Sequence, residues 1–266
     1  MEAFLYTSGG LGFIFLMTCL GSATVFFFRK AAPGKMQQVC LGFAAGVMMA
    51  ASVWSLLIPA IKAAEDMGIP EWIPAAGGFI LGVFFLFGLD QVIPHLHPFT
   101  NVQEGLPSNS KRTTLLISAI TLHNIPEGMA VGLAFALAAN GEPAMYGAAI
   151  ALALGIGIQN FPEGAAVSLP LRQEGMSTGK AFFLGALSGA VEPVFGFLAV
   201  LLAFWVAPLM PWLLAFAAGA MIYVVVEELI PEASAGEHSH GGTMGAMGGF
   251  LVMMVLDVAL SPPPPG

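Results

Sequence analysis

Two copies of the pattern Asn-x-Pro-Glu-Gly lie inside long apolar stretches of the chain, at 124–128 and 160–164. Each copy has a further polar residue directly before its asparagine. On a helix, residues three and four positions apart share a face, so each glutamate would point the same way as both polar residues. These side chains are His123, Asn124 and Glu127 in the first copy, and Gln159, Asn160 and Glu163 in the second. Carboxylate, amide and imidazole groups on one face could together bind a divalent transition-metal ion.

The proline of each motif predicts an interrupted helix. Pro126 and Pro162 lack an N–H group, and each ring clashes with the carbonyl four residues earlier. Inside a membrane a freed carbonyl needs a new partner. Buried carboxylates in an apolar stretch indicate a functional site, because an ionisable group is costly there. The alternative is a hydrogen-bonded cluster that only joins two helices, but two facing carboxylates favour a cation or protons between them.

The composition is that of a polytopic membrane protein. Of 266 residues, 57% are hydrophobic and only 9% are charged, whereas soluble domains carry about 25% charged residues. We expect a single transmembrane domain over 1–266. Eight basic residues are too few for a nucleic-acid-binding surface. Cys19 and Cys40 form neither a disulfide framework nor a paired metal motif.

The apolar runs predict an all-α membrane protein with eight transmembrane helices, since about 20 apolar residues span the hydrocarbon core. The predicted spans are 9–28, 37–62, 72–94, 113–139, 144–170, 180–206, 210–231 and 243–260. Seven of the eight basic residues fall in loops on one side, which positive charge predicts to be cytoplasmic. Only Lys62 lies on the other side. Both termini are therefore expected outside.

The two motifs form an inverted repeat. With eight spans, the fourth and fifth run in opposite directions, so the motifs lie on antiparallel neighbours. Inverted repeats that meet near the midplane at interrupted helices are typical of secondary transporters. We expect three flanking spans on each side of the pair, which gives a 3+2+3 inverted-repeat bundle.

The two motifs, together with Met48 in the segment 45–52, resemble the ZIP (Zrt-/Irt-like) family of divalent-metal transporters, and its bacterial members in particular. The resemblance covers essentially the whole chain. It implies two adjacent metal positions bridged by Glu127 and Glu163. One position would use Met48, His123 and Gln159, and the other Asn124, Asn160 and Glu192.

A second group of acids and histidines lies at the cytoplasmic ends of two spans. They are Asp90, His95 and His97 at the third span, and Glu227 and Glu228 in the seventh. They form either an exit route for the ion or ordinary solvated helix ends. Adjacent residues do not share a helix face, so only one of Glu227 and Glu228 should point inward. We assign no role to Asp257. The loop that contains His238 and His240 is expected to be a mobile segment rather than a metal site.

The resemblance implies uptake of Zn²⁺ into the cytoplasm across a bacterial inner (plasma) membrane, with Cd²⁺, Fe²⁺ and Mn²⁺ as further candidates. The metal would be the transported substrate, and no cofactor is expected. A gated metal-selective channel with the same ligands stays open as an alternative. An intramembrane metalloenzyme is disfavoured, because the chain lacks the His-Glu-x-x-His pattern of zinc proteases; we expect no enzyme. The expected partners are the metal ion and the lipid bilayer, with a homodimer left open.

Overall fold

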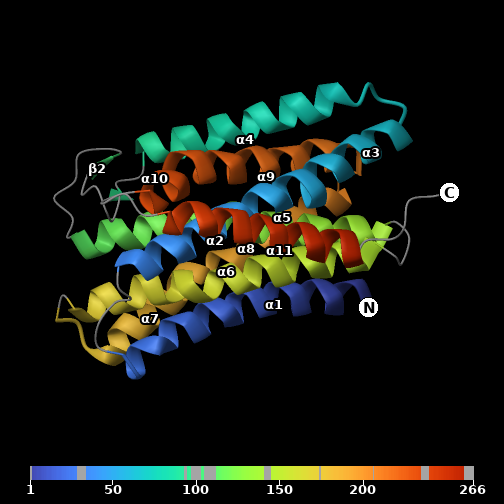
Figure 1. The fold of residues 1–266 in the computed structure, drawn as a ribbon. Helices are drawn as coiled ribbons and strands as arrows, with labels where there is room; N and C mark the ends of the chain where they lie inside the picture. Colours follow the sequence, from blue (N-terminus) through green and yellow to red (C-terminus); the bar gives the residue numbers. More distant parts are fainter. Residues whose placement is uncertain are drawn as a thin grey trace.

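Long helices run side by side along a common axis in a computed structural model of the chain (Figure 1). The structure describes residues 2–28, 34–92, 95–96, 103–104, 112–140, 145–173, 175–205, 207–234 and 240–260. The α-helices are α1 Glu2–Ala23, α2 Gly34–Ala51, α3 Ile58–Asp66, α4 Trp72–Val92, α5 Arg112–Asn140, α6 Met145–Gln173, α7 Thr178–Gly189, α8 Val191–Trp205, α9 Met210–Val224, α10 Ile230–Ala233 and α11 Gly241–Leu260. The shorter elements are η1 Thr24–Phe26, η2 Ser52–Leu57, η3 Ala207–Leu209, η4 Val225–Leu229, and the paired strands β1 His95–Leu96 and β2 Gln103–Glu104.

The predicted all-α membrane architecture is confirmed. Seven helical stretches of the described chain are long and apolar enough to cross a membrane. The remaining predicted span, 113–139, corresponds to α5, which has 29 residues. At 1.5 Å per residue α5 is about 43 Å long, which exceeds a hydrocarbon core of about 30 Å. The largest shift in a boundary is at the start, where α1 begins at Glu2 rather than at residue 9.

Helix pairing follows the inverted repeat. Helix α1 packs along α6 and α5 packs along α8, while α2 packs along α11 and α4 along α9. Exchanging the first three spans for the last three, and α5 for α6, turns each of these pairs into another pair of the set. The start of α1 and the end of α11 lie at one end of the bundle, and β2 and α10 lie at the other (Figure 1). This arrangement agrees with an even number of crossings and a 3+2+3 plan.

The second and seventh spans each contain a π-helical segment, η2 and η4, with a proline two residues after its end. Pro59 follows η2 and Pro231 follows η4. A proline ring clashes with the carbonyl four residues back, and those carbonyls lie within the two π-helical segments. The wider π turn relieves the clash without ending the span. The two segments also occupy equivalent positions in the inverted repeat.

The predicted interruptions at Pro126 and Pro162 are wrong. Helices α5 and α6 run through both prolines without a break. A proline removes one helical hydrogen bond, and packing by neighbouring helices allows the helix to continue on both sides. The sixth span is interrupted instead: α7 ends at Gly189 and α8 begins at Val191, just before Pro193. The close approach of the two motifs therefore does not depend on broken helices.

The packing of α2 against α11 provides a matched test of helix contact. A Cβ atom added at Gly249 would overlap the backbone of Phe43, whereas one added at Gly248 would meet nothing within 4 Å. We expect Gly249→Ala to lower the free energy of unfolding by about 1–3 kcal/mol, as overpacking does. Gly248→Ala should leave it unchanged or slightly higher, because alanine favours helix. Thermal unfolding of both variants in detergent measures this, and equal midpoints would contradict the packing.

Candidate metal centre

Helices α5 and α6 join at the two motifs through buried polar side chains. Glu127 on α5 is fully buried, and its Oε1 accepts a hydrogen bond of 2.5 Å from Gln159 Nε2 on α6. Gln159 and Asn160 are also fully buried. The α-helical spacing places the polar residues of each motif on one face of its helix, and their burial shows that these faces lie against neighbouring helices. The paired motifs thus lie in the interior of the bundle.

Neighbouring helices hold three further proposed ligands in place. Asn124 donates a 3.0 Å hydrogen bond to the Ser188 carbonyl on α7. Asn160 donates to the Ile14 carbonyl on α1 at 3.4 Å. Glu192, at the start of α8, is fully buried and accepts a 3.1 Å hydrogen bond from Thr18 on α1. Each amide therefore uses its nitrogen on a backbone carbonyl and leaves its oxygen for other partners.

One oxygen of each of five side chains is buried without a hydrogen-bond partner among the described residues. These oxygens are Asn124 Oδ1, Glu127 Oε2, Gln159 Oε1, Asn160 Oδ1 and Glu192 Oε2. Carboxylate and amide oxygens are acceptors only, and a buried acceptor left unpaired costs about 1–3 kcal/mol. Five such acceptors on adjoining helices cannot satisfy one another. They need donors or a cation.

Three carboxylates share this region. Glu163 on α6 is partly buried and interacts electrostatically with both Glu127 and Glu192, which also interact with each other. No lysine or arginine occurs in the sequence between Arg112 and Arg172. Apart from His123, the regions of α5 and α6 around the two motifs therefore contain no basic residue that could offset the negative charge. Buried carboxylates that repel one another require a counter-charge or protons.

The glycine that ends each motif allows the helices to approach closely. A Cβ atom at Gly128 would overlap the backbone of Glu192 on α8. A Cβ atom at Gly164 would overlap the backbone of Thr18 and Ser22 on α1. Small residues commonly permit such backbone contact between membrane helices. The two motifs are thus held by equivalent contacts, one to the sixth span and one to the first.

Of the other two predicted ligands, the structure describes the side chain of Met48 but not that of His123. Met48 is fully buried on α2 in the apolar core, together with Leu152 and Ile156 of α6. The backbone of His123 belongs to α5, but its side chain lies outside the described residues. No three described His, Cys, Asp or Glu side chains converge into a group that could hold a metal ion. The described part of the centre combines carboxylates with amide oxygens instead.

The predicted exit residues are only partly described. Asp90, at the end of α4, is buried and accepts a 2.8 Å hydrogen bond from the Tyr223 hydroxyl of α9. Glu228 is buried and Glu227 is exposed, as their adjacency on a helix predicts. His95 begins β1, and its side chain is not described; His97 and His238 lie outside the described residues, and His240 is exposed. Asp90 and Glu228 are therefore buried rather than solvated, whereas Glu227 faces outward.

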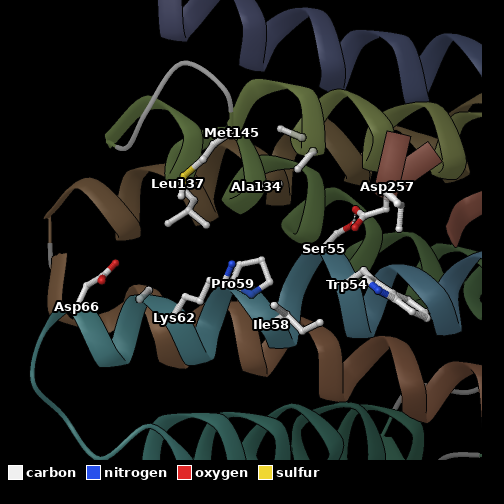
Figure 2. A pocket seen from close by; sticks show the side chains of 14 residues that line it. Trp54, Ser55, Ile58, Pro59, Lys62, Asp66, Ala134, Leu137, Met145 and Asp257 are labelled. Atoms are coloured by element: carbon white, nitrogen blue, oxygen red, sulfur yellow. Dashed lines mark hydrogen bonds between the residues drawn. The ribbon is translucent and has the colours of Figure 1, made fainter. Parts of the chain in front are cut away.

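The sequence interpretation gave Asp257 no role, but the structure places it in a cavity of about 540 Å³ (Figure 2). Asp257 of α11 is buried and accepts a 2.8 Å hydrogen bond from Ser55 of η2. Lys62 and Asp66 of α3 line the same cavity. Ser55 and Asp257 are 202 positions apart in sequence. The only sequence signal for an interior position was the polarity of Asp257 within an apolar run.

Comparison with known proteins agrees with this arrangement. The family model for the ZIP zinc transporter matches residues 102–257. Zinc transporter ZIP11 of Xenopus tropicalis is 40% identical over 92% of this chain and 94% of its own length. The chain belongs to the ZIP family. Among other ZIP relatives, zinc transporter ZIPB of Bordetella bronchiseptica is 39% identical over 92% of this chain and 78% of its own length. Zinc transporter GufA of Myxococcus xanthus is 38% identical over 78% and 80%, respectively.

Membership in the ZIP family decides several expectations. The resemblance inferred from the paired motifs is confirmed. The family consists of transporters rather than enzymes, so the prediction that the chain is not an enzyme is confirmed. Zinc is cargo for such proteins rather than a cofactor. Helices suited to crossing the membrane several times agree with a multi-pass membrane protein.

Proposed function

We propose that this protein transports a divalent transition-metal ion, with Zn²⁺ as the main substrate, through a binuclear site between α5 and α6. The observation that carries the proposal is the set of five buried acceptor oxygens without hydrogen-bond partners among the described residues. A pair of divalent cations would satisfy these oxygens and neutralise the three carboxylates. Glu127 and Glu163 would bridge the two ions.

The ligands divide between two positions in this proposal. Met48, His123 and Gln159 would hold one ion, and Asn124, Asn160 and Glu192 would hold the other. A set that mixes imidazole, thioether and oxygen suits zinc and its first-row neighbours better than calcium or magnesium. Relatives named zinc transporters support zinc. Cd²⁺, Fe²⁺ and Mn²⁺ are the further substrates to be tested.

The packing of the helices suggests how the ion would cross. Helices α1 and α5–α8 pack mainly with one another, as do α2–α4 with α9–α11. The five unpartnered oxygens all belong to the first group. Movement of this group against the second would give alternating access, as in other transporters built from inverted repeats. The whole chain, 1–266, would then act as a single transport domain.

The route would begin at the cavity that contains Asp257 and end near Asp90 and Glu228. The cavity adjoins Ala134 of α5, two turns after Glu127 on the same helix, and Val258 near the end of α11. Acidic side chains at both ends would attract a cation. The excess of basic residues in the loops at the opposite end supports uptake into the cytoplasm of a bacterial inner membrane, with both termini outside. A lipid bilayer is the required surrounding, and a homodimer is compatible with this scheme.

Reconstitution tests the function directly. Purified protein in vesicles that contain a zinc-sensitive dye should show zinc uptake that saturates with concentration and is inhibited by Cd²⁺. A gated channel would instead give much faster flux without saturation in the same range. Uptake no greater than that of protein-free vesicles would refute metal transport. The same vesicles with competing Fe²⁺ and Mn²⁺ measure selectivity.

A further inference from the structure

Helix α1 supplies none of the proposed ligands, yet it contacts two of them. Thr18 Oγ1 lies 3.1 Å from Glu192 Oε1, and Asn160 Nδ2 lies 3.4 Å from the Ile14 carbonyl oxygen one turn away on α1. Both contacted residues belong to the same proposed metal position. A helix without ligands therefore touches both of the side chains that α6 and α8 contribute to that position.

The Thr18 hydroxyl has one proton and two acceptors within reach. Its Oγ1 lies 3.3 Å from the Ile14 carbonyl oxygen and 3.1 Å from Glu192 Oε1. Hydrogen bonds to ionised acceptors are about twice as strong as those between neutral groups. The Ile14 carbonyl already accepts a hydrogen bond from Asn160. An ionised Glu192 therefore accepts the hydrogen bond from the Thr18 hydroxyl. Helix α1 thus holds Asn160 through the Ile14 carbonyl and Glu192 through Thr18, one turn apart.

The orientation of Thr18 is fixed by its surroundings. The residue is 1% exposed. A Cβ atom at Gly189 would overlap the Thr18 side chain, and one at Gly164 would overlap its carbonyl. Two helices therefore pack closely on Thr18 through glycines, and its β-branched side chain has few rotamers in a helix. A hydroxyl held in this way can fix the carboxylate that it contacts.

The inverted repeat relates Thr18 to Glu192. Gly164 of α6 packs against Thr18 of α1, and Gly128 of α5 packs against Glu192 of α8. Thr18 therefore occupies on the first span the place that Glu192 occupies on the sixth. One repeat contributes a carboxylate to the centre, and the other contributes the hydroxyl that holds this carboxylate.

The geometry points to Thr18 as a positioning residue for the metal position formed by Asn124, Asn160 and Glu192. The hydroxyl binds Glu192 Oε1 and leaves Oε2, which has no hydrogen-bond partner among the described residues, for the ion. This inference rests on the proposed binuclear site. Groups that orient a metal ligand from behind typically change metal affinity 10- to 100-fold when they are removed.

Titration of the purified protein with Cd²⁺ in detergent tests the inference. Thr18→Val keeps the shape of the side chain and removes the hydroxyl. It should therefore lower the Cd²⁺ affinity of the position that contains Glu192 by about tenfold or more. Thr18→Ser keeps the hydroxyl and should restore binding to within about threefold of the wild type. Loss of affinity in both variants, or in neither, would overturn the assignment, because only Thr18→Ser retains the hydroxyl. The thermal midpoint of each variant shows that the protein is folded.

Two further variants separate this inference from the function on which it rests. Ser22→Ala removes another buried hydroxyl of α1, which donates to the Gly164 carbonyl at 3.2 Å and has no hydrogen bond to a proposed ligand among the described residues; its Cd²⁺ binding should match the wild type. Glu192→Gln should lower the Cd²⁺ affinity of the same position, and the double variant with Thr18→Val should show no further loss of affinity. A normal Glu192→Gln isotherm would refute the proposed site itself. A weakened Glu192→Gln with a normal Thr18→Val would refute only the role of Thr18.

Discussion

Glu127→Gln is expected to reduce zinc uptake into vesicles by at least about a hundredfold. The side chain is fully buried, and the substitution removes a negative charge that would bridge two cations. Removing one partner of a buried charge pair costs about 3–5 kcal/mol, and each 1.4 kcal/mol corresponds to a tenfold change in affinity. Glu163→Gln should also reduce zinc uptake strongly, because the Glu163 carboxylate interacts electrostatically with Glu127 and Glu192. Dye-loaded vesicles with equal amounts of inserted protein measure both.

The control for these variants is a carboxylate of the exposed surface. Glu65→Gln, on the exposed end of α3, removes the same charge without touching the centre. Its uptake should stay within about twofold of the wild type, because isolated surface charges contribute little. Normal uptake by Glu127→Gln and Glu163→Gln together would contradict the assignment of the two glutamates.

Gly128→Ala is expected to lower uptake to about a tenth of the wild-type rate or less, although it adds only one methyl group. The new Cβ would overlap the backbone of Glu192, so α5 and α8 would have to separate. Overpacking of this kind costs about 1–3 kcal/mol. The separation would also displace Glu127 and Glu192 from each other. Uptake should therefore fall even at temperatures where the Gly128→Ala protein remains folded.

A glycine with free space around it serves as the comparison for Gly128. A Cβ atom at Gly12 of α1 would meet nothing within 4 Å. Gly12→Ala should therefore leave both the unfolding midpoint and the uptake rate unchanged. If Gly128→Ala behaved in the same way as Gly12→Ala, the close contact between α5 and α8 would not be needed for transport.

The sequence alone was sufficient to predict the spans and the meeting of the two motifs. Long apolar runs fix helix positions, since each must hold about 20 residues in the hydrocarbon core. The spacing within each motif then places Asn124 and Glu127 on one helical face. The direction of the fourth and fifth spans follows from counting. None of these steps needs a contact between residues far apart in the chain.

The remaining features depend on such contacts. Thr18 lies in an apolar run where hydroxyl residues are ordinary, and only its distance to Glu192 distinguishes it. Asp257 and Ser55 meet across the bundle. The effect of a proline depends on its surroundings as well: Pro126 leaves α5 continuous, whereas Pro59 follows a π-helical segment. Whether a helix absorbs a missing hydrogen bond or widens a turn is decided by the helices packed against it.

The shared end of the bundle for the start of α1 and the end of α11 makes orientation measurable in living cells (Figure 1). Fluorescent reporters fused before Glu2 and after Leu260 would occupy the same compartment, whichever compartment that is. A quencher that cannot cross the bilayer, added to intact cells, would therefore dim both reporters or neither.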